Sequence, residues 1–280
     1  PALGSAGNTA ANTTTAPDGG IGGKFLIIGH AGSPRKEPDN TIVGFERALK
    51  DGANGLETDV CVTKDNVLVL WHDWSPHGSV ALARKAGLTG FKYRPDFGYN
   101  SKPVDQFTLE ELRREYGYVL PVAGQEGISW ERSPHQIPTF EEFAKWAADK
   151  AAIELIYLDI KIPADSGYYA DLFVSEIWRI TEKHGISGKI VFFTTNKDIA
   201  ARAAEFAKKN GIGLKIGLDR EMPAALTMSP VGDGTVKARI NIPSFAPVQD
   251  ASDMNLDYAA VGRPSRVTIA GGWKTYSRII

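Results

Sequence analysis

Six residues with side chains suited to acid–base or metal chemistry fall within or at the ends of four short apolar segments. They are His30, Glu57, Asp59, His72, Asp159 and Lys161. An unpaired buried charge is costly, so charged side chains inside apolar segments need either a partner or a function. Their placement in four consecutive segments indicates one shared site.

Two of these segments carry a pair of charged residues at alternate positions. Side chains alternate along a strand, so Glu57 and Asp59 share one face, as do Asp159 and Lys161. Two carboxylates within one pleat repeat repel each other, and a bound cation relieves that repulsion. We therefore predict that Glu57 and Asp59 bind a metal ion. Asp159 and Lys161 could instead simply form an ion pair with each other.

The residue types restrict the kind of ion. Cys61 is the only cysteine, which excludes an intramolecular disulfide and a zinc site built on several thiolates. We interpret it as a small apolar residue of a strand. Three carboxylates suit Ca²⁺ or Mg²⁺. Such an ion beside two histidines and a lysine suggests phosphoester chemistry, in which one histidine removes a proton and the other donates one.

The elements that must position these residues alternate between strands and helices. Continuous apolar runs predict strands over 24–30, 55–62, 67–72, 153–162, 189–194 and 212–218. Amphipathic segments predict helices over 41–50, 167–184 and 197–209. A seventh strand is expected at 238–242 or 258–261 and an eighth at 267–270. This alternation indicates a parallel sheet, whose carboxyl edge would gather the six residues.

A long connection over 74–150 separates the third and fourth predicted strands. It holds two helices, each opened by a Thr-x-x-Glu capping box, at Thr108–Glu111 and Thr139–Glu142. The alternating pattern fits an open doubly wound sheet and a closed barrel equally well.

Composition excludes several classes of protein. The chain has 280 residues, of which 42% are hydrophobic and 23% charged, which indicates a folded domain. A net charge of -1 argues against a nucleic-acid-binding domain. No apolar run reaches the roughly 20 residues that a membrane-spanning helix needs.

The ends of the chain differ from its middle. Residues 1–23 are rich in Gly, Ala, Thr and Asn, which predicts a flexible arm. Small polar arms often follow an export signal, so we expect a secreted or periplasmic protein, with a cytoplasmic one as the alternative. Without the arm and the long connection, about 180 residues remain, few for eight strand–helix units. The last such unit is therefore expected to be missing.

The stretch from Ile27 to Asp73 resembles the glycerophosphodiester phosphodiesterase family. The resemblance continues through the segments KPVDQFTLEEL (102–112), IPTFEEF (137–143) and LDIK (158–161). It implies an α/β fold, a (β/α)8 TIM barrel over 24–280, with a small insertion after strand three formed by about 74–150.

The resemblance also implies roles for single residues. His30 and His72 match the general acid and base, and Lys161 matches a lysine that contacts phosphate. Three carboxylates match ligands of one divalent cation: Glu57, Asp59 and Asp159, the last where the family usually has Glu. Ala31 stands where the family usually has an arginine that contacts phosphate. Arg35 or Lys36 is expected to reach back in its place, and Trp273 is expected near the site.

The implied reaction is metal-dependent hydrolysis of glycerophosphodiesters to glycerol 3-phosphate and an alcohol, through a cyclic phosphate. One alternative is a phospholipase D-like enzyme acting on lysophospholipids or sphingolipids. It would need contact with a membrane surface, which aromatic residues of 74–100 could supply unless they form the insertion's own core. A second alternative, favoured only by Ala31, is a non-catalytic barrel that binds a phosphate ligand.

Overall fold

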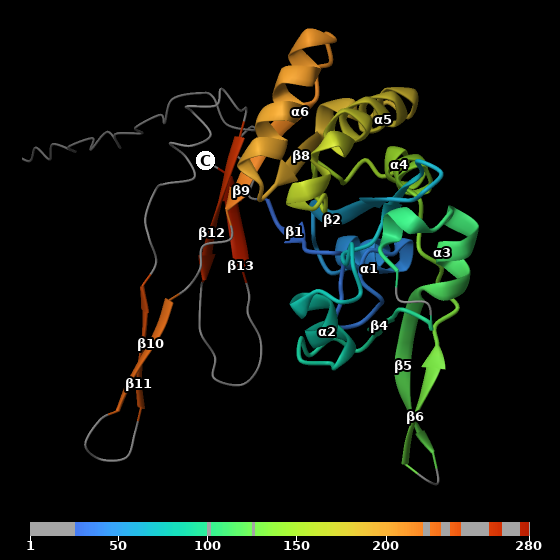
Figure 1. The fold of residues 1–280 in the computed structure, drawn as a ribbon, viewed down its shortest axis with the longest axis vertical. Helices are drawn as coiled ribbons and strands as arrows, with labels where there is room; N and C mark the ends of the chain where they lie inside the picture. The colour runs from blue at the N-terminus through green and yellow to red at the C-terminus, as the bar shows by residue number, and fades with distance from the viewer. Residues whose placement is uncertain are drawn as a thin grey trace, which may run out of the picture.

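The largest sheet of the computed structural model has the order β1-β2-β7-β8-β9-β12-β13, with β3 paired to β2 (Figure 1). The structure describes residues 26–99, 102–124, 127–220, 225–230, 236–241, 258–264 and 275–279. The strands are β1 Ile28–Gly29, β2 Gly55–Val62, β3 Leu68–Leu70, β7 Leu155–Ile160, β8 Ile190–Thr194, β9 Lys215–Arg220, β12 Tyr258–Pro264 and β13 Thr275–Ile279. Neighbours from β1 to β12 run parallel, as predicted, and β13 is antiparallel to β12.

The direction of β3 differs from the predicted one. It runs antiparallel to β2, so the expectation of a third parallel strand is wrong. The chain between the two strands is a tight turn in which Asn66 has φ 62°. A turn this short joins only antiparallel strands, because a parallel pair needs a crossover of about a dozen residues. The return strand brings the Trp71 amide to the Asp59 carbonyl at 3.1 Å, and so carries His72 back to the level of Asp59.

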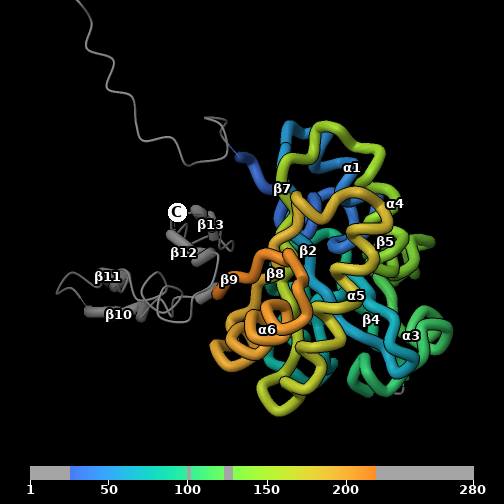
Figure 2. Tube along the Cα trace, turned by 90° about the horizontal axis from the view of Figure 1, so that it is seen from above, coloured from blue at the N-terminus to red at the C-terminus, as the bar shows by residue number. Residues whose placement is uncertain are grey.

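Four helices cover one face of this sheet: α1 Ile42–Lys50, α4 Phe140–Ala148, α5 Ala170–Lys183 and α6 Lys197–Lys209. Figure 2 shows α4, α5 and α6 outside the layer formed by β2, β7 and β8. The main apolar core lies between the helices and the strands, where Phe45, Phe143 and Phe173 pack against Leu56 and Ile156. This packing leaves the opposite face of the strands to other residues.

The two capping boxes predicted from the sequence are confirmed, and α1 is also capped by a side chain. The Thr41 hydroxyl accepts a hydrogen bond from the Gly44 amide at the start of α1. Both capping boxes form, at Thr108 before α3 Leu109–Glu115 and at Thr139 before α4. These caps satisfy backbone amides that the first turn of a helix leaves without partners.

The segment between β3 and α4 contains a second, smaller apolar core. From the sequence we considered such a core only for the aromatic residues of 74–100. The segment includes α2 Ser79–Lys85, the short helix η1 Val104–Gln106 and an antiparallel sheet of β4 Arg94–Asp96, β5 Gly117–Gly124 and β6 Gly127–Arg132. Phe97 and Tyr116 pack around Trp71, while Tyr99 is fully exposed. The aromatic residues of 74–100 are therefore divided between this core and the surface. α4 packs in the main core instead.

The later elements are η2 Ala164–Tyr169, η3 Ser187–Lys189, β10 Ala225–Pro230 and β11 Val236–Asn241. The second proposed position for a seventh strand, 258–261, is confirmed, since β12 extends the sheet from β9. The first, 238–242, falls mostly in β11, which pairs with β10 in a separate two-stranded sheet. Within the residues that the structure describes, no strand pairing joins β13 to β1. The predicted arm, the strand at 267–270 and Trp273 lie outside those residues.

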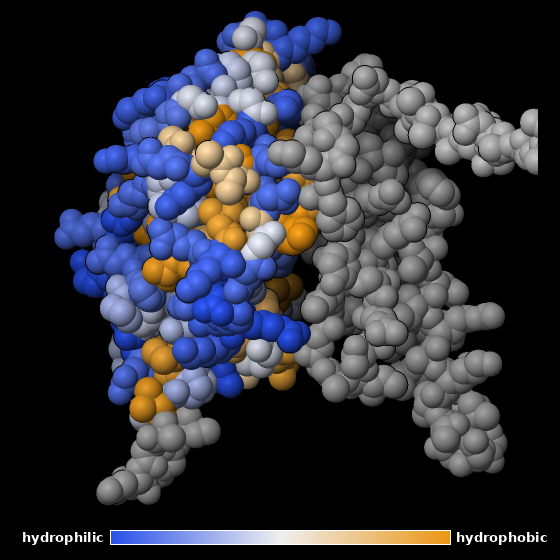
Figure 3. Space-filling view, turned by 180° about the vertical axis from the view of Figure 1, so that it is seen from behind, coloured by the Kyte–Doolittle hydropathy of each residue, from blue (hydrophilic) through white to orange (hydrophobic). Residues whose placement is uncertain are grey.

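Seen from behind, the surface formed by the described residues is mainly hydrophilic, with hydrophobic residues between the hydrophilic ones (Figure 3). The helices in the described ranges are all too short or too polar to cross a bilayer.

Candidate metal and acid–base site

Three carboxylates converge on the sheet face that lies opposite the helices. In the parallel pairing of β2 with β7, Asp59 stands beside Asp159, and Glu57 precedes Asp59 on the same face. Each of the three offers one oxygen, and these oxygens lie within 4.8 Å of one another. Alternation along both strands produces this grouping, because Leu56, Val60 and Ile160 turn to the main core instead. The predicted ligand set is therefore brought together.

One backbone amide and one side-chain amide orient two of the three carboxylates. The Ala31 amide donates to Glu57 Oε2 at 2.7 Å, and Asn40 Nδ2 donates to Asp59 Oδ2 at 2.7 Å. The side-chain oxygen of Asn40, Oδ1, accepts hydrogen bonds from the Thr58 hydroxyl and the Asp59 backbone amide. These bonds fix the orientation of the Asn40 side-chain amide. Asn40 has φ 54°, a conformation that asparagine tolerates better than most residues. Asn40 was not among the site residues predicted from the sequence.

Lys161 pairs with two of the carboxylates. Its Nζ lies 2.6 Å from Asp159 Oδ2 and 3.0 Å from Asp59 Oδ1. The simple ion pair considered for Asp159 and Lys161 therefore forms, within the larger cluster. Since one ammonium faces three carboxylates, the cluster keeps an excess of negative charge that a divalent cation would neutralise.

The carboxylates differ in their electrostatics. Burial raises the pKa of Glu57 to about 7, and the Asp59 and Asp159 charges add to that shift. Burial acts in the same direction on Asp59, but Lys161 and the two histidines outweigh it and hold the pKa of Asp59 below its usual range. In the absence of a cation, Glu57 thus holds a proton near neutral pH more readily than Asp59 does.

This difference predicts a pH-dependent cation affinity. A cation at this cluster would bind Glu57 in its charged form, so a proton would leave as the cation binds. With a pKa of about 7 for Glu57, the apparent affinity for Ca²⁺ or Mg²⁺ is expected to rise about tenfold between about pH 6 and pH 8. Isothermal titration calorimetry in buffers of different ionisation enthalpy measures both the affinity and the released proton. For Glu57→Gln, a persisting tenfold rise would contradict this assignment.

The two histidines lie in different surroundings. His30 Nε2 is 3.9 Å from Glu57 Oε2, and its side chain is 72% exposed. The Glu57 carboxylate raises the pKa of His30. His72 is 26% exposed, and its Nδ1 lies 2.7 Å from Oδ1 of the buried Asp73. The His-Asp order at 72–73 was visible in the sequence, but a supporting role for Asp73 was not predicted.

The remaining predicted substrate residues are less closely tied to the site. Arg35 is exposed in the loop between β1 and α1. Lys36 bonds to Asp51 at 2.9 Å, at the C-terminal end of α1. Lys36 is therefore engaged with another partner, and Arg35 remains the candidate of the two.

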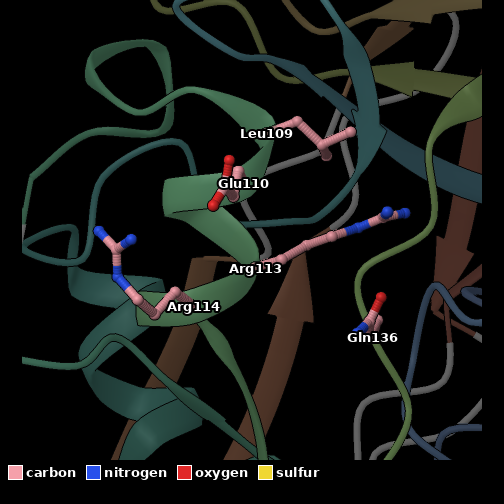
Figure 4. Close-up of a pocket in the computed structure, with 5 residues that line it drawn as sticks. All are labelled: Leu109, Glu110, Arg113, Arg114 and Gln136. Atoms are coloured by element: carbon pink, nitrogen blue, oxygen red, sulfur yellow. The ribbon is translucent and has the colours of Figure 1, made fainter.

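A shallow hollow elsewhere on the surface shares no residue with this site. It lies beside α3 and is lined by Leu109, Glu110, Arg113, Arg114 and Gln136 (Figure 4). Arg113 bonds to the Ile137 carbonyl and to Glu142, so it joins α3 to the start of α4.

Comparisons with known proteins identify the family that this chain resembles. The model of the glycerophosphoryl diester phosphodiesterase family matches residues 30–264. A glycerophosphodiester phosphodiesterase of Caldanaerobacter subterraneus is 37% identical over 138 residues, which are 49% of this chain and 46% of the relative. The human glycerophosphoinositol inositolphosphodiesterase is 28% identical over 178 residues, 62% of this chain and 32% of the relative. The chain thus spans less than half the length of either relative.

Solved structures show the same fold. A Silicibacter pomeroyi crystal structure superposes with a TM-score of 0.58 at 17% identity, over 84% of this chain and 73% of that chain. An Oleispira antarctica phosphodiesterase, solved with the product sn-glycerol-3-phosphate, gives 0.50 at 18% identity, over 83% and 72%. The family match and these neighbours confirm the predicted TIM-barrel fold class, to which β1, β2, β7, β8, β9 and β12 contribute a parallel sheet.

Proposed function

The chain belongs to the glycerophosphoryl diester phosphodiesterase family, and we propose that it hydrolyses glycerophosphodiesters to glycerol 3-phosphate and an alcohol. The grouping of three carboxylates with His30, 3.9 Å from Glu57, and with His72 at the level of Asp59 carries this proposal. The product bound to the Oleispira antarctica phosphodiesterase supports it, as does the name of the Caldanaerobacter subterraneus relative.

The donor set suits a hard divalent cation. Glu57, Asp59 and Asp159 supply only oxygen ligands, the kind that Ca²⁺ and Mg²⁺ prefer. Such an ion, when bound, would polarise a phosphoryl oxygen and stabilise negative charge at phosphorus. Because Lys161 touches Asp59 and Asp159, its ammonium would share the same region with the substrate phosphate.

His72 is the better general base of the two histidines. Asp73 accepts a hydrogen bond from His72 Nδ1, which places the ring proton on Nδ1 and leaves Nε2 able to take a proton. We propose that Nε2 removes the proton of a glycerol hydroxyl as its oxygen attacks phosphorus. The bond from phosphorus to the alcohol oxygen then breaks, and a cyclic phosphate remains.

His30 is the better general acid. The Glu57 carboxylate favours its protonated form, and its ring is exposed to solvent. We propose that His30 gives its proton to the departing alcohol oxygen. In the second half of the reaction the roles reverse: His30 removes a proton from water, which opens the cyclic phosphate, and His72 returns its proton to the glycerol oxygen.

Ala31 stands where the family usually has an arginine that contacts the phosphate. We propose that Arg35 makes this contact instead. Ala31 itself has φ 50° and directs its amide to Glu57, so position 31 contributes its backbone to the site. The proposed role of Trp273 rests on the sequence alone.

A substrate panel tests the proposed function. We expect turnover of glycerophosphocholine or glycerophosphoinositol with added Ca²⁺ or Mg²⁺, and none after chelation. Activity that survives chelation would contradict the metal assignment. Turnover of lysophosphatidylcholine without turnover of either glycerophosphodiester would favour the phospholipase D-like alternative. Binding of these compounds without any turnover would favour the non-catalytic barrel.

A further inference from the structure

A buried arginine of α2 bridges two carboxylates next to the site. Arg84 Nη2 contacts Asp39 Oδ2, and Arg84 Nη1 contacts Asp73 Oδ2. All three residues are only 4% exposed. Although burial disfavours the charged form of Arg84, the two carboxylates outweigh it and raise the pKa of its guanidinium. The three residues therefore form a charged network inside the protein.

Such a network is a poor device for stability alone. Taking charges out of water costs several kcal/mol per ion, and apolar side chains of similar size are often as stabilising. A planar guanidinium does offer fixed geometry, since its two nitrogens reach two carboxylates in set directions. The network is therefore better explained by the orientation that it gives to neighbouring side chains than by a gain in stability.

One arm of the network leads to the proposed general base. Asp73 uses Oδ2 for Arg84 and Oδ1 for His72 Nδ1. With one oxygen bound to Arg84, the carboxylate cannot turn freely, and the direction of its other oxygen is set. Arg84 thereby helps to fix the orientation of the His72 ring and the position of its Nδ1 proton.

The other arm leads to the carboxylate cluster. Asp39 directly precedes Asn40, whose side chain donates to Asp59 Oδ2 and accepts from the Asp59 amide. Asn40 is fully buried with a positive φ, so its conformation depends on what holds the backbone around it. The bond from Arg84 to Asp39 holds the residue next to it.

We propose that Arg84 is a positioning residue that sets the orientation of His72 through Asp73 and of Asp59 through Asp39 and Asn40. It would make α2, which lies outside the main sheet, a common support for proton transfer and cation binding. The inference rests on the proposed function for its kinetic consequences, but its structural consequences can be measured without turnover.

The first test is Arg84→Lys. Lysine keeps the positive charge, but it lacks the two guanidinium nitrogens with which Arg84 contacts Asp39 and Asp73. We expect kcat for glycerophosphocholine and affinity for Ca²⁺ or Mg²⁺ each to fall about 10- to 100-fold, with KM changed far less than kcat. The matched control is Arg113→Lys, which alters another arginine that joins two segments, on α3. The control is expected to keep both values, and an equal loss in both variants would indicate a general structural effect and contradict the proposal.

Single-arm variants separate the two effects and replace the first test if Arg84→Lys does not fold. Asp73→Asn is expected to lower kcat about 10- to 100-fold while cation affinity is kept, because Asp73 contacts His72 directly and the bond from Arg84 to Asp39 remains. Asp39→Asn is expected to weaken cation binding by a similar factor. Wild-type values of both quantities in both variants would overturn the proposal.

A spectroscopic measurement keeps this test distinct from that of the proposed function. Nitrogen-15 NMR of His72 in the wild-type protein should show a single tautomer with the proton on Nδ1. Arg84→Lys should show a mixture of tautomers, and Arg113→Lys should match the wild type. If the wild type hydrolyses no glycerophosphodiester, the proposed function fails while this comparison still decides the role of Arg84. An unchanged His72 spectrum in Arg84→Lys would contradict the inference.

Discussion

Replacing His72 with alanine is expected to lower kcat for a glycerophosphodiester by about 10²- to 10⁴-fold without unfolding the protein. The loss is large because His72 is the proposed base in the first step and the proposed acid in the second. The fold should persist because the His72 side chain is partly exposed, and because Asp73 keeps its contact with Arg84. His30→Ala is expected to cause a loss of similar size, since it removes the partner in both proton transfers.

Steady-state kinetics with thermal unfolding measure these effects. His77→Ala is a suitable control, because it removes an exposed histidine only five residues along the chain from His72 and outside the proposed site. We expect wild-type kcat for this control. If His72→Ala or His30→Ala kept more than about a tenth of wild-type kcat, the two-histidine mechanism would be wrong.

Asp59→Asn is expected to weaken binding of Ca²⁺ or Mg²⁺ at least about a hundredfold and to abolish most activity. Asp59 is the most enclosed of the three carboxylates and contacts both Asn40 and Lys161. Asparagine has nearly the same shape, so the change removes charge without opening a cavity. Two carboxylates then remain, and Lys161 offsets one of them.

Calorimetric titration of the metal-free protein with each cation measures this loss directly. Asp198→Asn, in the exposed first turn of α6, is the matched control for the loss of one carboxylate. An Asp59→Asn protein that binds either cation as tightly as the wild type would contradict the ligand assignment. Retained binding together with lost activity would instead assign Asp59 to substrate or proton chemistry.

The carboxylate cluster could be predicted from the sequence because it depends on local alternation. Glu57 and Asp59 are two positions apart on one mainly apolar strand, and Asp159 lies on a second mainly apolar strand. Once the two strands pair in parallel, the register places Asp59 beside Asp159. Neither residue type nor spacing, however, indicates which charged residue of the long connection reaches the site. Arg84 is 45 positions from Asp39, and only the folded chain brings them together.

The direction of β3 and the sheet of β4, β5 and β6 were harder to predict for a different reason. An apolar run shows that a strand is buried but not which way it runs, and the short turn at Asn66 was the only clue to a hairpin. β5 contains Pro121 and glycines at both ends, which weaken a strand pattern. The second core forms from aromatic residues that are far apart in the sequence.

Barrel and open sheet share the same alternation of strands and helices, so local patterns could not decide between them. The family resemblance supplied the barrel, and the family match with the solved neighbours confirms that fold class. The site does not depend on how the last strands are arranged, because all six residues first singled out lie within β1, β2, β3 and β7 or at most two residues beyond their ends.

Phosphorus-31 NMR of glycerophosphocholine incubated with the wild-type protein tests the proposed reaction most directly. With Ca²⁺ or Mg²⁺ present, the diester resonance should be replaced by that of glycerol 3-phosphate, and a chelator or the His72→Ala change should prevent this. The appearance of phosphocholine in place of glycerol 3-phosphate, or an unchanged diester with either cation, would contradict the account.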